Sequence, residues 1–174
     1  MINDKKMFWI ASYPKSGNTW LRLILCGLFF TEDGNLNNFN LLNKITGFDN
    51  LKNFRFVKKK SLDDYNIIFN GREYNEESVL TYSKYWIEAQ KKINIEKGKF
   101  GLFKTHNARL KINNNFYTDS STTLGFIYLS RDPRDIAISY SKHINKDIDE
   151  TISFLLDGQI MKKEKIDNKM PEII

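Results

Sequence analysis

The stretch that decides the fold is Met7–Phe30, MFWIASYPKSGNTWLRLILCGLFF. It begins with a short apolar run of high strand propensity, and Pro14 ends this run because proline has no N–H to donate to a β-ladder. We therefore expect a strand that ends near Ser12. From Thr19 onward, apolar side chains surround nearly the whole helical wheel, with Arg22 as the polar exception. This pattern predicts an inner helix that is covered on most sides.

The loop between the expected strand and helix, Lys15-Ser16-Gly17-Asn18-Thr19, favours phosphate binding. Gly17 allows a backbone conformation in which successive N–H groups point into one concavity, and the helix adds its unpaired amides and positive dipole end. Lys15 contributes a positive charge, and Ser16 and Thr19 contribute hydroxyl donors. The alternative is an ordinary turn in which Ser16 or Asn18 only caps the helix.

This loop and its flanks, Tyr13–Trp20 (YPKSGNTW), closely resemble the sulfotransferase loop that binds the 5′-phosphosulfate end of 3′-phosphoadenosine 5′-phosphosulfate (PAPS). The family usually has threonine in place of Asn18; an amide also offers a donor and an acceptor, so we expect phosphate binding to be adjusted rather than abolished. A Walker A loop has lysine directly after glycine, so the order here weakens an ATP-binding interpretation. The resemblance implies cofactor contacts from Lys15, Ser16, Gly17, Asn18 and Thr19, with Trp20 beside the adenine or, alternatively, in the core.

Composition and charge limit the class of protein. The 174 residues predict one domain, and the net charge of +6 lacks the basic stripe typical of nucleic-acid binding. Cys26 is the only cysteine, so no internal disulfide can form and a reducing compartment fits. The longest apolar run, Leu23–Phe30, is too short for a membrane span, and no secretory signal is recognisable. We expect a cytoplasmic protein without a nucleic-acid partner; its oligomeric state stays open.

Residues 31–99 are expected to form a variable region that contributes an acceptor-lining lid. Two short apolar groups, Phe54–Val57 and Ile67–Phe69, fit either brief helices or edge strands. Glu76–Ile93 has apolar residues at the period of a half-buried helix, and we expect its aromatic stripe to lie in the core.

Phe100–Thr105 is the next expected strand, with Lys104 and His106 at its carboxyl end. In open parallel sheets, ligands bind beyond the carboxyl ends of the strands. The sequence FKTH at this place is similar to the Lys-x-His motif of sulfotransferases. This similarity implies that His106 is the general base and that Lys104 assists Lys15 in stabilising charge on the leaving oxygen. The other histidine, His143, is expected to be exposed.

A third expected strand, Leu124–Ser130, runs directly into Arg131, and the Asp-Pro pair that follows suits an N-cap and the first position of a helix. The segment Tyr128–Tyr140 resembles the part of sulfotransferases that binds the 3′-phosphate of PAPS, with Arg131 and Ser139 in the matching places. A guanidinium can bind two phosphate oxygens and a hydroxyl a third. The alternative is that Arg131 caps the sheet edge and Ser139 fills space.

The resemblance covers residues 7–145 and implies an α/β, P-loop-like three-layer fold with a central parallel sheet. Within a single domain of residues 1–174, it divides the chain into strand, phosphosulfate loop and helix (7–30), acceptor region (31–99), and catalytic and 3′-phosphate segments (100–145). Sulfotransferases of this type usually continue further, with a late segment that completes the 3′-phosphate site. We therefore expect a short or C-terminally truncated, bacterial-type member with that part of the fold missing.

The implied activity is transfer of a sulfuryl group from PAPS to a hydroxyl or amine of a small-molecule or glycan acceptor. No metal is expected, because the sequence offers no cluster of cysteine and histidine ligands. Two alternatives stay open: a non-catalytic nucleotide-binding fragment of this fold and, less favoured, a P-loop-like nucleotide kinase.

Overall fold

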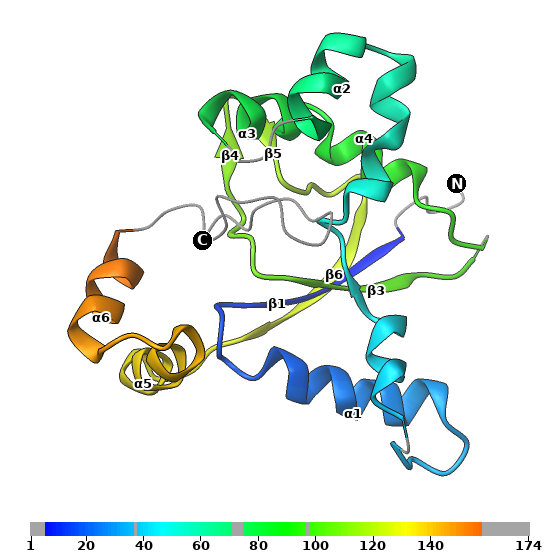
Figure 1. Ribbon diagram of the computed structural model, residues 1–174. Coiled ribbons are helices and arrows are strands. Elements are labelled where there is room, and N and C mark those ends of the chain that lie inside the picture. The colour runs from blue at the N-terminus through cyan, green and yellow to red at the C-terminus, as the bar shows by residue number, and fades with distance from the viewer. Residues whose placement is uncertain (1–5, 37, 71–74, 97, 158–174) are drawn as a thin grey trace.

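A four-stranded parallel sheet forms the centre of the molecule (Figure 1). The computed structural model describes residues 6–36, 38–70, 75–96 and 98–157. The strands follow the order β2-β3-β1-β6, with the bounds β1 Met7–Ser12, β2 Thr46–Gly47, β3 Gly101–Thr105 and β6 Thr123–Leu129. The three strands expected from the sequence are thus neighbours, and the predicted fold with a central parallel sheet flanked by helices is confirmed.

Helix α1 (Asn18–Phe30) and the 3₁₀ helix η1 (Phe39–Lys44) cover one face of the sheet, which we call the α1 face. Its core is small and consists of the buried side chains of Ile10, Cys26 and Ile45. The prediction of an inner helix is wrong for α1: Trp20 and Leu28 are each 68% exposed. Only one stripe of the helix packs on the sheet, and none of the described segments covers its outer side, so its apolar content exceeds what the fold buries.

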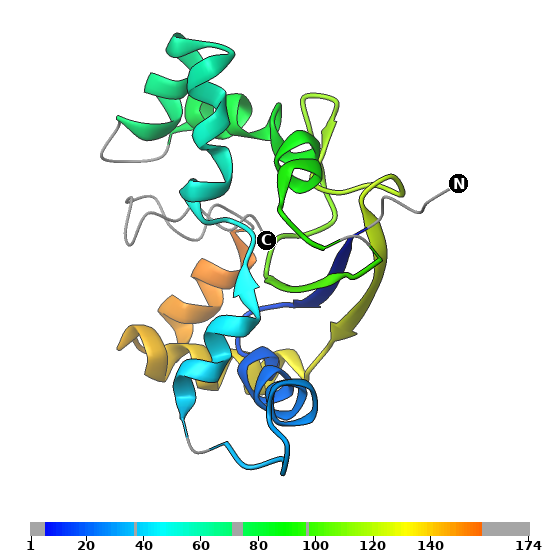
Figure 2. The ribbon, with the colours of Figure 1, turned by 90° about the vertical axis from the view of Figure 1, so that its right-hand side faces the viewer.

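The opposite face carries most of the core, and we call it the aromatic face. Its buried cluster includes Trp9, Phe48, Tyr82, Trp86 and Tyr117, whose rings contact one another largely edge to face or tilted. Figure 2 shows the helices of this face and α1 on opposite sides of the strands. The covering segments are η2 (Leu51–Lys59), α2 (Leu62–Phe69), α3 (Glu76–Ser83) and α4 (Trp86–Lys92).

Two sequence expectations are refined on the aromatic face. The short apolar groups Phe54–Val57 and Ile67–Phe69 lie in η2 and α2. Of the two alternatives, brief helices and edge strands, the structure therefore shows the helices. The single helix expected over residues 76–93 is instead two helices, separated after Ser83. At the break, Tyr85 turns outward and donates a hydrogen bond to Asp64 Oδ2 (2.7 Å), while Tyr82 and Trp86 stay in the core as expected.

The remaining elements flank the carboxyl edge of the sheet or extend from it. A hairpin of β4 (Lys111–Ile112) and β5 (Asn115–Phe116) turns through Asn113 and Asn114, both with positive φ, which fits a tight two-residue hairpin turn. Helices α5 (Pro133–Ile144) and α6 (Ile148–Leu156) pack against each other. None of the helices within the described ranges is long and apolar enough to cross a membrane.

Candidate functional site

The carboxyl ends of β1, β3 and β6 meet at one edge of the sheet, and each of the three sequence motifs follows one of these ends. His106 comes directly after β3, and its Nδ1 lies 2.8 Å from the carbonyl oxygen of Ser12, the last residue of β1. Arg131 follows β6, and its Nη1 donates to the carbonyl oxygen of Lys15 (3.2 Å). The motifs are distant in sequence and contact each other in space.

The loop after β1 has an unusual backbone. Lys15 (φ 66°) and Gly17 (φ 98°) both adopt positive φ, and such a conformation costs a non-glycine residue on the order of 1–3 kcal/mol unless its surroundings stabilise it. A Cβ on Gly17 would meet no atom within 4 Å, so glycine is needed there for its dihedral angle rather than for space. Ser16 is only 7% exposed, and its Oγ has no hydrogen-bond partner among the described residues. An anion at the N-terminus of α1 would satisfy this hydroxyl.

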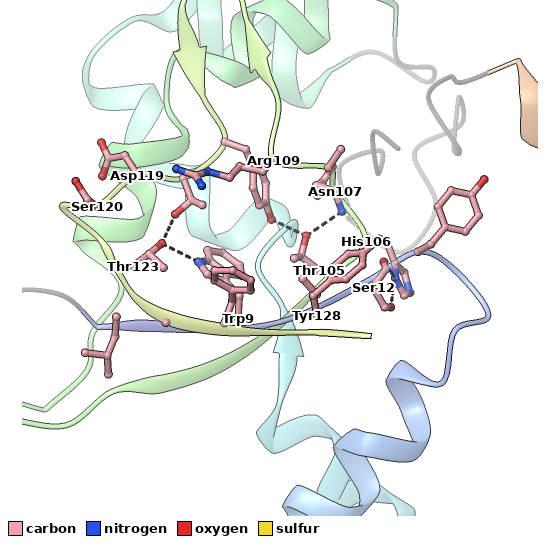
Figure 3. Close-up of a pocket in the computed structure, with 18 residues that line it drawn as sticks. Trp9, Ser12, Thr105, His106, Asn107, Arg109, Asp119, Ser120, Thr123 and Tyr128 are labelled. Carbon is pink, nitrogen blue, oxygen red and sulfur yellow. Dashed lines mark hydrogen bonds between the residues drawn. The ribbon is translucent and has the colours of Figure 1, made fainter. Parts of the chain in front are cut away.

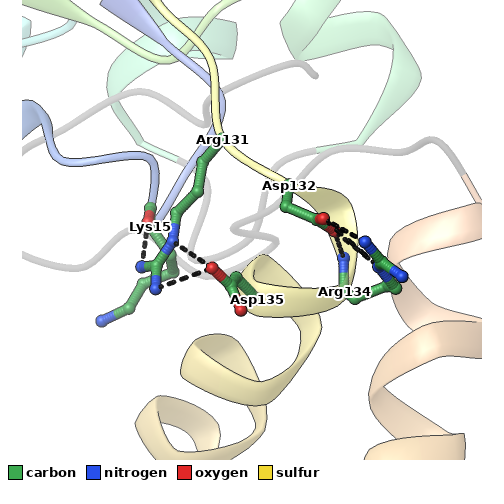
Figure 4. A network of polar contacts seen from close by, with 5 residues as sticks. All are labelled: Lys15, Arg131, Asp132, Arg134 and Asp135. Carbon is green, nitrogen blue, oxygen red and sulfur yellow. Dashed lines mark hydrogen bonds and ion pairs between the residues drawn. The ribbon is translucent and has the colours of Figure 1, made fainter.

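Arg131 lies over this loop (Figure 4). Its Nε also approaches Asp135 Oδ2 (3.4 Å), which orients the guanidinium from the first turn of α5. The neighbouring Arg134 pairs with Asp132 instead, with 2.6 Å between Nη2 and Oδ2, and its hydrogen bonds lower the pKa of the Asp132 carboxyl. Arg131 and Ser16 line one cavity of about 370 Å³, whose other walls are largely apolar side chains of α5 and α6. We call it the anion cavity after these two polar residues.

The tautomer of His106 follows from its partner. Nδ1 contacts Ser12 twice, at 2.8 Å from its carbonyl oxygen and at 3.1 Å from its Oγ. A hydroxyl can donate or accept but a carbonyl oxygen only accepts, so the shorter contact places the proton of the neutral ring on Nδ1. Nε2 is then the basic nitrogen. The ring lies at the rim of a second cavity of about 440 Å³, shown in Figure 3, which we call the acceptor cavity. Its walls include the aromatic side chains of Trp9, Tyr13, Tyr117, Phe126 and Tyr128.

The two cavities adjoin, because Tyr13 and Tyr128 line both. Burial raises the pKa of the Tyr13 phenol, so this side chain is neutral at physiological pH. Neither tyrosine was predicted from the sequence to be a site residue. A usable signal was present: Tyr13 and Tyr128 directly flank the loop and the strand end that carry the motifs.

Asn18 lies at the start of α1 and is 5% exposed. Its Nδ2 donates to the carbonyl oxygen of Ile10 (3.0 Å) and to Ser12 Oγ (3.1 Å). The carboxamide is therefore directed toward strand β1. Thr19, one residue further, is exposed.

The other residues expected at the site are more dispersed. Lys104 is half-buried in β3, and strand alternation places its side chain on the α1 face, opposite to Thr105, which lines the acceptor cavity. Trp20 lies on the outer side of α1 and lines a separate groove with Ile24 and Leu28. Ser139 is half-buried in α5 and does not line the anion cavity. The structure thus places Arg131 against Lys15 and beside Ser16, and His106 against Ser12 in the adjoining cavity. Trp20 and Ser139 line neither cavity.

The described residues that line the acceptor cavity come from the loops and strand ends around β1, β3 and β6. They fall within 9–13 and 105–128, and none of them belongs to the described part of the region 31–99. In the part of the chain that the structure describes, no three His, Cys, Asp or Glu side chains gather in a way that could bind a metal ion.

Comparison with known proteins identifies one family. A family model described as "Sulfotransferase domain" matches residues 5–165, which is most of the chain. No curated protein and no solved structure gives a significant match.

Proposed function

The chain belongs to the sulfotransferase domain family, and we propose that it transfers a sulfuryl group from PAPS to a hydroxyl or amine acceptor. One observation carries this proposal: the Nδ1 contact of His106 with the Ser12 carbonyl leaves Nε2 as the basic nitrogen, at the rim of a cavity that adjoins the anion-binding loop.

The residues around the loop fit the two anionic ends of PAPS. Lys15, Ser16 and Gly17, with Asn18 and Thr19 through their backbone N–H groups, would bind the 5′-phosphosulfate, and the unpartnered Ser16 hydroxyl supports this. By the resemblance, Arg131 would bind the 3′-phosphate, and its guanidinium lies close enough to the loop to contact a nucleotide that is bound there. Ser139 and Trp20 would join only after a rearrangement of α5 and α1.

Each catalytic group has a defined role in the proposed reaction. PAPS supplies a sulfuryl group activated by its bond to the 5′-phosphate. Nε2 of His106 accepts the proton of the acceptor's hydroxyl or amine, whose oxygen or nitrogen bonds to sulfur while the bond from sulfur to the phosphate oxygen breaks. Lys15 stabilises the negative charge that grows on that oxygen. The resemblance gives Lys104 a supporting role, for which its side chain would have to reach the oxygen from the α1 face. A positioned base contributes about 10²–10⁴ in rate.

The acceptor cavity supports a small acceptor with an apolar or aromatic body. Its volume of about 440 Å³ lies in the range of small-molecule sites. Aromatic walls also suit the apolar faces of a sugar ring, so a glycan acceptor is tested alongside phenols and alcohols. A cytoplasmic location fits the single cysteine, Cys26, which is buried.

Calorimetry with the product nucleotide, 3′-phosphoadenosine 5′-phosphate, tests the donor site, and labelled PAPS with a panel of phenols, alcohols, amines and sugars tests transfer. We expect the nucleotide to bind without magnesium and label to reach at least one acceptor class. Preference for ATP with a magnesium requirement would contradict the proposal in favour of a kinase.

A non-catalytic nucleotide-binding role is the second candidate. The positions of Trp20 and Ser139 outside the anion cavity favour it. Nucleotide binding without transfer to any acceptor of the panel would support this role instead.

A further inference from the structure

We infer that Asn18 is a positioning residue for His106 and that its side chain does not bind phosphate. The inference rests on the proposed function of His106 as the base. It assigns to Asn18 a role in a chain of hydrogen bonds, the Asn18 network, which runs from the Asn18 carboxamide through Ser12 to the His106 ring.

The first step concerns the donors of Asn18. A primary amide has two N–H donors, and Nδ2 uses them on the Ile10 carbonyl (3.0 Å) and on Ser12 Oγ (3.1 Å). The Ile10 carbonyl can only accept, so it fixes which atom of the carboxamide is nitrogen. The remaining atom, Oδ1, is an acceptor and would repel a phosphate oxygen. Only the backbone N–H of Asn18 is suited to an anion.

The second step concerns Ser12. Its Oγ accepts from Asn18 Nδ2 and also lies 3.1 Å from His106 Nδ1. Its carbonyl oxygen accepts from the same Nδ1 (2.8 Å). The register of β1 with β3 ends at the pair Ala11 and Thr105, so this carbonyl lies just beyond the ladder between the two strands. On its other side, Ser12 is still paired with Leu129 of β6. The Asn18 network therefore adds to the β1–β6 pairing in holding the peptide group that selects the tautomer of His106, on the side where the β1–β3 ladder has ended.

The third step explains why the residue type matters. Threonine, usual at this place in the family by the resemblance above, has one O–H donor and cannot donate to Ile10 and Ser12 together. Asparagine spans both, and its burial at 5% exposure leaves the amide little freedom to turn away. The Asn18 network thus links the start of α1 to the proposed base by direct hydrogen bonds.

The test combines a spectroscopic readout with a kinetic one. The chain has only two histidines, so ¹⁵N NMR resolves both rings, and the exposed His143 serves as an internal reference. We expect wild-type His106 to show the Nδ1–H tautomer. In Asn18→Ala, it should shift toward the mixture that His143 shows, and Asn18→Thr should be intermediate. Asn35→Ala is the matched control, because it removes an exposed amide that donates to Asp33.

The kinetic readout separates positioning from phosphate binding. Loss of the hydrogen-bond partner that orients a metal-bound histidine typically costs about 10–100-fold in activity. We expect a decrease of the same order in the kcat of Asn18→Ala, with the Kd for 3′-phosphoadenosine 5′-phosphate almost unchanged. An unaltered Nδ1–H tautomer in Asn18→Ala overturns the inference, and so does a weakened Kd with unchanged kcat. If the His106 tautomer changes in Asn18→Ala but the wild-type protein transfers no sulfuryl group, the Asn18 network is supported and the proposed function is refuted.

Discussion

The two faces of the sheet differ in how completely they are covered. The aromatic face buries large interlocking rings, whereas the α1 face has a core of three small or medium side chains beneath a helix whose outer side is exposed. Strand β1 contributes to both, with Trp9 on one side and Ile10 on the other. The proposed base lies beside Trp9 and Tyr117, which belong to the aromatic face, and the proposed phosphate-binding loop leads into the less covered helix. We therefore expect stability to depend mainly on the aromatic face.

The largest expected effect is in the aromatic core. Trp86→Ala removes a ring that contacts Tyr82 and Tyr117 and should lower the free energy of unfolding by about 3–5 kcal/mol. Leu28→Ala, on the exposed side of α1, should change it by no more than about 0.5 kcal/mol. Urea unfolding of both variants measures the difference. A loss in Leu28→Ala similar to that in Trp86→Ala would show that the outer side of α1 is covered rather than exposed.

The next effect concerns nucleotide binding at the loop. Arg131→Ala should weaken binding of 3′-phosphoadenosine 5′-phosphate by about 1.5–3 kcal/mol, the range for hydrogen bonds to charged groups. The neighbouring Arg134 is paired with Asp132 and highly exposed, so Arg134→Ala is a matched control with little expected effect. Calorimetry measures the nucleotide affinity of both variants. Equal losses of affinity in Arg131→Ala and Arg134→Ala would contradict a specific role of Arg131 in nucleotide binding.

A smaller effect is expected from Gly17→Ala. Because Gly17 has a φ of 98° and no crowding, the added methyl group costs backbone strain of about 1–2 kcal/mol without a clash. Thermal unfolding with and without the product nucleotide measures this cost and the accompanying loss of affinity. Wild-type stability with wild-type affinity would mean that the loop does not need its left-handed turn.

The outer layer of the aromatic face has its own dependence on pH. Burial, followed by the hydrogen bond to Asp64, raises the pKa of Tyr85 to about 12 from 10.0. In the unfolded chain the phenol has its ordinary pKa of 10.0 and ionises more readily than in the folded protein. Its contribution to the free energy of unfolding is therefore complete below about pH 10 and is lost as the pH rises through about 12. Tyr85→Phe should therefore lose less stability than wild type over this interval in urea unfolding. Parallel losses in both proteins would exclude Tyr85 as the cause.

Much of the edge that carries the site could be predicted from local sequence. The apolar run before Pro14 and the runs that end at Thr105 and Leu129 each specify a strand by short-range chemistry, and parallel pairing then brings their carboxyl ends together. The exposure of α1 could not be predicted, because periodicity reports which side chains are apolar and not which segments cover them.

The acceptor cavity and the Asn18 network were beyond sequence reasoning for a different physical reason. The cavity is lined by segments that are close only after folding, with Tyr13 and Tyr128 more than a hundred positions apart. From its place in the loop, Asn18 is predicted to bind phosphate. Only the structure shows that its carboxamide donates both of its hydrogen bonds to residues of β1. Long-range contacts of this kind leave no periodic signal in the chain.

The central claim is that a base and an anion-binding loop from distant motifs form one site. Its most direct measurement is the turnover of His106→Ala with labelled PAPS, alongside nucleotide affinity and His143→Ala as the control. We predict that turnover falls by about 10²–10⁴ while the affinity for 3′-phosphoadenosine 5′-phosphate stays near that of wild type. Wild-type turnover in His106→Ala would contradict the account.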